Sequence, residues 1–267
     1  MNEHARAITA IVARDARVFW SYRLRVVREL AGTILLVTLF YELAQLVSSS
    51  HFPTPRAYFE FAAVGLALAP MLRSGLVTPP AALREELLCG TFERLALSPS
   101  GAGACLLATL VLPFAIAVVD GLIILAVAGA LFGLQLDWPG SALALPLGAL
   151  TALALAPFGG LLLAVGVLVK QVNAGSGWLV AVLGLVGGVY FPPALLPSWI
   201  GWAAAAQPVT PALDLLRHAL TGAPAGAPVA RALAELVAFA VIGLPLAAIA
   251  LRAACERARR RGTLLVY

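Results

Sequence analysis

The chain has 267 residues, of which 61% are hydrophobic and 12% charged, and its mean hydropathy is +0.96. So apolar a composition excludes a soluble domain, because too little polar surface would remain to face water. The formal net charge is +5, but the basic residues flank apolar runs and lack interleaved aromatic residues, so nucleic-acid binding is not expected. The sequence predicts an all-α integral membrane protein.

Residues 1–28 predict an amphipathic helix in the membrane interface. Apolar residues recur at helical spacing on one face, and arginines occupy the opposite face. Helices of this kind lie flat with their basic side chains among lipid headgroups. Asp15 interrupts the apolar face, where it either contacts a span or a partner or only reaches toward water.

Six apolar runs follow, each long enough for the roughly 20 residues that a membrane-spanning helix needs. The fifth run is barely adequate, and the two before it are longer than a span requires. The expected spans are 30–47, 57–77, 104–131, 142–169, 172–191 and 229–251.

The distribution of basic residues predicts the orientation in the membrane. With six spans both termini lie on one side, and that side receives 15 of the 18 lysines and arginines. Only Arg56, Arg217 and Arg231 fall on the other side. By the positive-inside rule, both termini are cytoplasmic, with residues 252–267 as a cytoplasmic tail.

The segment REELLCGTFERLALSP, between the second and third spans, holds five charged residues within its first eleven positions. Thr78 precedes two prolines, which is the pattern of an N-cap and a first helical turn. Gly90 is suited to a left-handed helix stop, after which Thr91 can cap a second helix with Glu93 in its first turn. The segment 79–99 is therefore either a docking element of two short helices or a solvated loop with ordinary caps.

The segment 190–222 follows the fifth span and contains several prolines. Its paired prolines should end that span. Thr210 with the following proline predicts a further helix that stops at Gly222. Asp214 and Arg217 are three residues apart and can form an ion pair on the surface of that helix. Short helices broken by prolines predict a partly re-entrant outer element.

Three acidic residues fall inside or near the ends of spans, namely Glu42, Glu60 and Asp120. Charge in lipid is costly, so such residues are candidates for function. Asp120, near the middle of the third span, is the best candidate for a proton-coupled secondary transporter. The alternative is a protonated or hydrogen-bonded residue in a helix-packing core, and no inverted repeat is apparent.

Enzymatic chemistry is not expected of this chain. Its only lysine, Lys170, does not belong to a Gly-x-x-x-x-Gly-Lys-Ser/Thr loop, so the chain cannot hydrolyse ATP by that machinery. Its three histidines are scattered without the spacing of a zinc site. We therefore expect neither catalytic residues nor a metal site.

Two of these segments resemble a known family. REELLCGTFERLALSP is similar to the cytoplasmic coupling segment of type 2 ABC exporter permeases, and GGVYFPPALLPSW…QPVTPALDLLRHAL resembles their outer segment. The order and separation of the two motifs agree with the family, as do the interfacial helix and six spans. The resemblance covers nearly the whole chain, although each motif alone is only moderately specific.

The resemblance implies a permease that dimerises, more often with a second copy of itself, in the inner membrane of a prokaryote. Two cytoplasmic ATPase subunits would bind ATP and magnesium, and the helix at 91–97 would lie in a groove of the ATPase. The implied coupling residues are Arg84, Glu85, Glu86, Gly90, Thr91, Phe92, Glu93, Arg94 and Leu95. The implied residues of the outer segment are Phe191, Pro192, Pro197, Asp214 and Arg217.

The expected cargo is an amphipathic small molecule or lipid that leaves the cytoplasm or the inner leaflet. The candidate pathway residues are Phe40, Tyr41, Phe61 and Asp120. Export of a glycan or glycolipid by a similar permease stays open, as does proton-coupled transport.

Overall fold

The computed structural model describes residues 13, 17, 23–46, 52–89, 106–169 and 173–260. Among these residues, five helical stretches are long and apolar enough to cross a membrane. They are Arg28–Leu46, Pro55–Leu88, Leu106–Phe132, Ala144–Val169 and Val229–Arg260. The prediction of an all-α integral membrane protein is confirmed.

Helix α2 (Arg23–Leu46) begins earlier than the first predicted span. Residues 23–28, predicted as the end of the interfacial helix, form the first turns of α2, and the stretch that is long and apolar enough to span begins at Arg28. The physical reason is that α2 contains no proline and only one glycine, Gly32, so nothing stops the helix between its basic start and its apolar body. The rest of the interfacial helix lies outside the described residues, apart from positions 13 and 17, which are helical.

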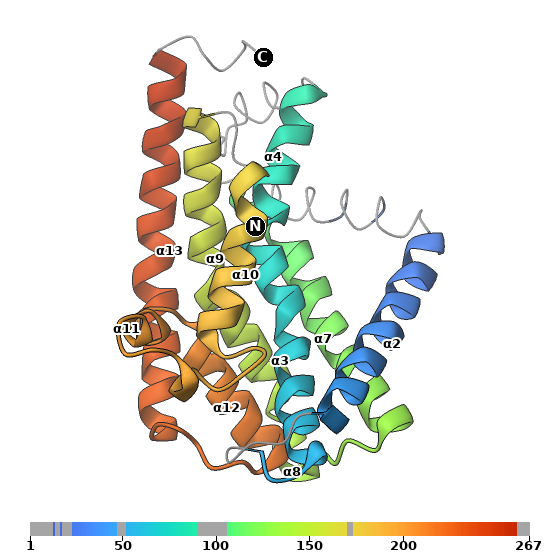
Figure 1. The fold of residues 1–267 in the computed structure, drawn as a ribbon. Helices are drawn as coiled ribbons and strands as arrows, with labels where there is room; N and C mark the ends of the chain where they lie inside the picture. Colours follow the sequence, from blue (N-terminus) through green and yellow to red (C-terminus); the bar gives the residue numbers. More distant parts are fainter. Residues whose placement is uncertain are drawn as a thin grey trace.

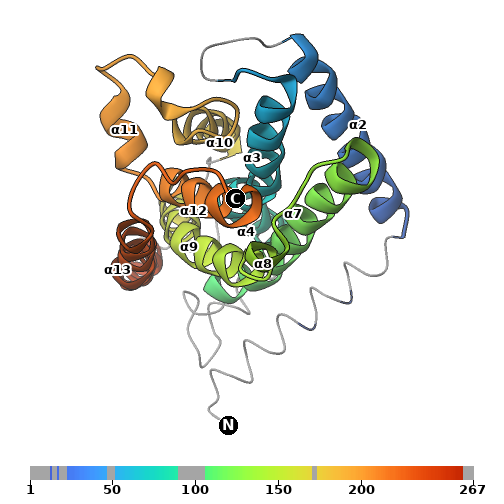
Figure 2. The ribbon, with the colours of Figure 1, turned by 90° about the horizontal axis from the view of Figure 1, so that it is seen from below.

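Helix α3 (Pro55–Leu76) is the central helix of the bundle. Thr54 caps its start, where the side-chain oxygen accepts from the backbone N–H of Ala57 at 3.2 Å. In the most apolar stretch of Pro55–Leu88, 61% of the residues are buried, compared with 11% for α2. Helix α3 therefore packs on several neighbours, whereas α2 lies at the edge (Figure 2).

The other long helices in the described part of the chain are α7, α9 and α13. Helix α7 (Val111–Phe132) ends at Gly133, whose φ of 68° is the left-handed stop that glycine allows. Helices α9 (Ala144–Val169) and α13 (Val229–Arg260) pack side by side through small residues. Methyl groups placed at Gly160 and Gly243 would press on Ala247 and Pro157, so these glycines allow the close approach.

Helix α13 continues as far as Arg260. The segment 252–260, predicted as the start of a cytoplasmic tail, is helical, because no breaker interrupts it and three arginines in the last turn suit the negative end of the helix dipole. At 32 residues α13 is about 48 Å long, which exceeds a hydrocarbon core of about 30 Å.

The fifth predicted span is shorter than expected. Helix α10 (Asn173–Gly187) has 15 residues, about 22 Å of helix, which is less than a full crossing. It ends before the paired prolines, because Gly188 turns the chain with a φ of 90°. The prediction of six full spans was therefore wrong for this element, and the prolines are not what ends it.

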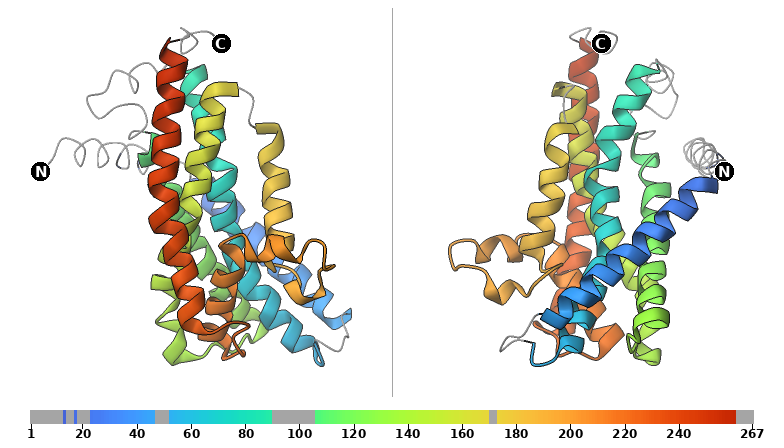
Figure 3. Two further views of the ribbon diagram at one scale, coloured as in Figure 1. Left: turned by 90° about the vertical axis from the view of Figure 1, so that its left-hand side faces the viewer. Right: turned by 45° about the vertical axis from the view of Figure 1, so that its right-hand side comes forward.

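Different helices lie at the two ends of the bundle (Figure 1). One, here called the α4 end, carries α4 (Thr78–Leu88) and the C-terminal end of α13. The opposite end, here called the α12 end, carries α8 (Trp138–Ser141) and α12 (Val209–Thr221). Helix α10 stops part-way between them. Beyond it, η1 (Pro193–Leu195) and α11 (Gly201–Ala205) project sideways from the bundle (Figure 3).

Candidate functional site

Helix α4 continues the second span alongside α9. A turn at Val77 separates it from α3, and the two run on as one apolar stretch, Pro55–Leu88. The predicted helix is present, but the predicted cap at Thr78 is wrong, since its hydroxyl donates to the carbonyl oxygen of Arg73 at 3.4 Å. Pro80 has no N–H to be capped, and the N–H of Ala81 is bonded to the carbonyl of Val77.

The two faces of α4 have different surroundings. Leu83 is 3% exposed and holds the inner face against the bundle, where α4 packs on α9. On the outer face Arg84 and Glu85 are exposed, and Leu88 near the tip is 64% exposed. Helix α4 therefore presents charge and one large apolar side chain beyond a firmly packed base.

The structure places only part of the predicted coupling site. Arg84, Glu85 and Glu86 lie together on α4, with Glu86 half-buried. The other predicted coupling residues lie outside the described residues. They are Gly90, Thr91, Phe92, Glu93, Arg94 and Leu95.

The outer segment forms short helices, as the prolines predicted. Helix α12 begins at Val209, and the predicted cap at Thr210 is wrong, because its hydroxyl donates back to the carbonyl of Ala204 at 2.8 Å. The predicted stop is confirmed, since Gly222 has a φ of 66°. Phe191, Pro192 and Pro197 lie in the loop that leads from α10 to α11.

Arg217 is the buried cation of the outer segment. It is 7% exposed, and its guanidinium donates to the carbonyl oxygens of Phe61 (3.1 Å) and Gly188 (2.7 Å). The guanidinium also lies 3.4 Å above the centre of the Phe61 ring, a cation–π contact. The predicted surface ion pair with Asp214 is wrong, because the side chain of Arg217 points into the protein toward α3.

The charge of Arg217 is retained at neutral pH. Burial lowers the pKa of its guanidinium to about 9. The nearby Asp214 carboxylate opposes this shift, because a negative charge raises the pKa of the guanidinium. A charged guanidinium with two carbonyl acceptors and an aromatic face satisfies the rule that buried charge must be hydrogen-bonded. Arg217 thus ties α12 to both α3 and the turn after α10.

Close backbone contacts strengthen the same region. A methyl group at Gly65 in α3 would overlap the carbonyl oxygen of Val189, and one at Gly140 in α8 would overlap that of Ala219 in α12. With its amide oriented to satisfy both neighbours, the buried Gln207 donates to Leu183 and accepts from Gly187 at 2.8 Å. The outer segment is therefore held by backbone contacts as well as by Arg217.

The four candidate pathway residues do not form one site. Phe40 stacks on Tyr190 at 5.9 Å between ring centres, whereas Phe61 lies under Arg217. Asp120 is half-buried in α7. Tyr41 lines a pocket to which α2, α3 and α7 contribute, and the other three do not line it.

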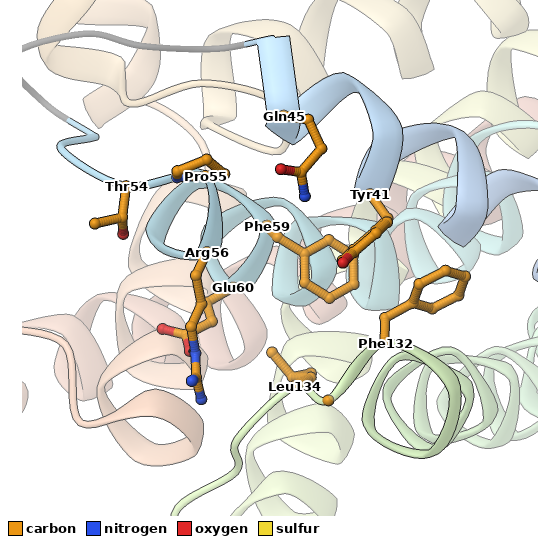
Figure 4. A pocket seen from close by; sticks show the side chains of 10 residues that line it. Tyr41, Gln45, Thr54, Pro55, Arg56, Phe59, Glu60, Phe132 and Leu134 are labelled. Carbon is orange, nitrogen blue, oxygen red and sulfur yellow. The ribbon is translucent and has the colours of Figure 1, made fainter.

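This pocket has a volume of about 310 Å³ and lies where α2 ends, α3 begins and α7 ends (Figure 4). Sequence reasoning did not single out most of its lining, which also includes Arg56, Phe59 and Phe132. Its side chains offer aromatic surface, one ion pair and a few polar groups. Within the described ranges, no group of three His, Cys, Asp or Glu residues could hold a metal ion.

A comparison with protein families found a match that extends over most of the chain. The model of the ABC-2 type transporter family matches residues 6–221. The chain belongs to this family. A comparison with curated proteins found no match.

Membership of the ABC-2 family defines the general role of the chain. It is a non-catalytic, multi-pass membrane subunit of an ABC transporter, and the family implies partnership with an ABC ATPase subunit. The matched residues include α4, the pocket and the outer segment as far as the end of α12 at Thr221.

Proposed function

We propose that the chain is the permease of an ATP-driven exporter, which moves an amphipathic small molecule or lipid out of the cytoplasm or the inner leaflet. Two copies would assemble with two ATPase subunits, which bind the ATP and magnesium. The observation that carries the proposal is α4, an exposed, charged helix that lies within the ABC-2 match and continues the most buried helix of the bundle.

Helix α4 is suited to transmit force. Its base is fixed because Leu83, Pro79 and Pro80 are buried against the bundle. Its outer face carries Arg84 and Glu85, which can pair with charges on a partner. A displacement at the tip therefore moves α3, and α3 contacts α2, α7, α9, α10 and α12. Coupling between two sites requires such an element with two arrangements.

The charge distribution supports a cytoplasmic position for the α4 end. The C-terminal part of α13, with Arg252, Arg257, Arg259 and Arg260, lies at the same end as α4 (Figure 1). Arg56 and Arg231 lie at the starts of α3 and α13, at the α12 end. The positive-inside rule then favours cytoplasmic termini in a prokaryotic inner membrane.

A second copy of the chain is the partner that the exposed helices favour. Helices α2 and α10 lie on either side of α3 (Figure 2) and carry exposed apolar side chains, such as Leu35 (72%) and Trp178 (76%). Lipid covers such surfaces as readily as protein does. We propose that two copies of the chain meet through these two helices, because α2 and α10 flank α3, and α3 continues into α4.

The proposal is tested by coexpressing the chain with a candidate ABC ATPase. We expect the two to copurify, and export from inverted vesicles to depend on ATP and to persist after the proton gradient is collapsed. Replacing Phe92 and Glu93 with alanine should leave folding intact and uncouple ATP hydrolysis from transport. The matched control is Arg231→Ala at the opposite end, which should change neither folding nor the coupling of ATP hydrolysis to transport.

Two outcomes would contradict the proposal. Transport that stops when the proton gradient is collapsed would favour a proton-coupled carrier that uses Asp120. Full transport by the Phe92 and Glu93 variant would remove the coupling role of the segment between the second and third spans.

A further inference from the structure

The pocket at the α12 end has one apolar wall. The rings of Tyr41, Phe59 and Phe132 form this wall from α2, α3 and α7 (Figure 4). Their centres lie 4.8–6.0 Å apart, as in edge-to-face or tilted ring pairs, so no guest fits between them. A ligand would lie against these rings.

The opposite wall is polar and carries no net charge. The Nε–H of Arg56 donates to Glu60 at 2.9 Å, and the two side chains are 53% and 27% exposed. The bond uses only the Nε–H of Arg56, so its two Nη groups can donate to a ligand. The wall therefore offers one guanidinium and one carboxylate side by side.

The position of the pocket sets the depth of a ligand in the membrane. Three spanning helices end or begin around it, with α2 ending at Leu46, α3 beginning at Pro55 and α7 ending at Phe132. Helix ends of this kind lie at the level of lipid headgroups. The last two turns of α2 expose Leu39, Leu43 and Leu46 about half a turn around the helix from Tyr41, so the outer side of α2 is apolar at this depth.

We propose that this pocket binds the headgroup of a zwitterionic phospholipid. The phosphodiester accepts hydrogen bonds from the Nη groups of Arg56, because a guanidinium matches the geometry of phosphate oxygens. The ammonium group pairs with Glu60 and lies near the Tyr41 ring. The first carbons of the lipid lie on the aromatic wall.

Size and charge select this class of ligand. A volume of about 310 Å³ is at the small end of ligand sites, which suits a headgroup rather than a whole lipid. An anionic headgroup could bind Arg56 through its phosphate but would bring no ammonium group to pair with the Glu60 carboxylate. A free headgroup would satisfy Arg56 and Glu60 but would leave the aromatic wall in contact with water. The site needs no ATPase, so it stands apart from the exporter proposal.

The test measures lipid binding to the delipidated full-length chain in detergent, by native mass spectrometry. The probes are dihexanoyl phosphatidylethanolamine, dihexanoyl phosphatidylglycerol and the chain-free glycerophosphoethanolamine. We expect the zwitterionic lipid to bind about 10-fold more tightly than either of the others.

The matched variants use two similar ion pairs in the described part of the chain. The double variant Arg56→Gln/Glu60→Gln should lose most of the preference, whereas Arg231→Gln/Glu235→Gln should keep it. The second pair has the same spacing and the same 2.9 Å bond, but it does not line the pocket. Exposed pairs of this kind contribute little to stability, so both variants should fold.

Equal binding of both lipids by the unaltered chain would overturn the proposal without any variant. An unchanged preference in Arg56→Gln/Glu60→Gln would do the same. Glycerophosphoethanolamine that binds as tightly as the lipid would overturn the assignment to a membrane ligand. None of these results bears on ATP-driven transport, so a failure here leaves the exporter proposal intact.

Discussion

The two ends of the bundle differ in how their charged side chains are surrounded. At the α12 end the chain satisfies its own buried charge, since Arg217 bonds to the carbonyls of Phe61 and Gly188. At the α4 end, Arg84 and Glu85 project outward on a helix with only one face buried. The difference indicates that the α12 end is held within the chain, whereas the outer face of α4 stays exposed, as the proposed contact with an ATPase requires.

The physical basis of the contrast is solvation. A buried donor or acceptor without a partner costs about 1–3 kcal/mol, so the interior of the outer segment must be fully bonded. Exposed charges on α4 are hydrated by water and lose little without a partner. Changes at buried positions of the α12 end should therefore reduce stability, and changes on the outer face of α4 should reduce only function.

The largest effect on stability is expected for Arg217→Met. The substitution leaves the carbonyls of Phe61 and Gly188 buried without this donor, and we expect the free energy of unfolding to fall by about 3 kcal/mol. Unfolding in detergent, followed by tryptophan fluorescence, measures the change. Arg217→Lys should be intermediate, since one ammonium cannot reproduce the planar fork of the guanidinium.

The control for this prediction is Arg231→Met. Arg231 has an exposed side chain (71%) at the same end, and its loss should cost less than about 0.5 kcal/mol. Equal losses for the two variants would show that Arg217 does not hold the outer segment in place.

A smaller loss of stability is expected for Gly140→Ala. The added methyl group would overlap the carbonyl of Ala219, so α8 and α12 must move apart, at a cost of about 1–3 kcal/mol. In α2, Gly32 has no atom within 4 Å of such a methyl group. Gly32→Ala should therefore leave the thermal midpoint unchanged or slightly higher. A Gly140→Ala protein as stable as the unaltered chain would contradict the close packing of α8 on α12.

The long helices could be predicted because lipid permits few alternatives. The run 57–77 became α3 at Pro55–Leu76, and 142–169 became α9 at Ala144–Val169, each shifted by one or two residues. In hydrocarbon every backbone group must be bonded within the helix, so a long apolar run has one solution. The end of the short helix α10 was not predicted, because the turn at Gly188 ends this helix before the prolines are reached.

The role of Arg217 could not be predicted from the sequence. Its spacing from Asp214 satisfies the rule for a surface ion pair, but its partners are backbone carbonyls, which every residue has and no motif marks. The pocket was not predicted for a related reason, because its lining comes from three segments, 41–45, 54–60 and 132–134, and the last is far from the others in the sequence. The strongest available signal was Arg56 four residues before Glu60, a spacing that predicts a pair but not a cavity.

The smallest effect on stability is expected for Glu85→Arg on the outer face of α4. Glu85 is exposed, so reversing its charge should change the free energy of unfolding by less than about 0.5 kcal/mol. If α4 contacts an ATPase, the same change should strongly lower copurification of the partner and ATP-dependent transport. The internal control is Leu83→Ala on the buried face, which should cost about 2–3 kcal/mol because it opens a cavity against the bundle.

Together the two α4 variants separate binding from folding. A partner surface requires that Glu85→Arg lowers transport at unchanged stability, while Leu83→Ala lowers stability first and transport only as a consequence. Full transport by a stable Glu85→Arg protein would mean that the charge of α4 serves only to keep this helix hydrated. The contrast between the two ends would then be one of packing alone, and contact with the ATPase would have to lie elsewhere on the chain.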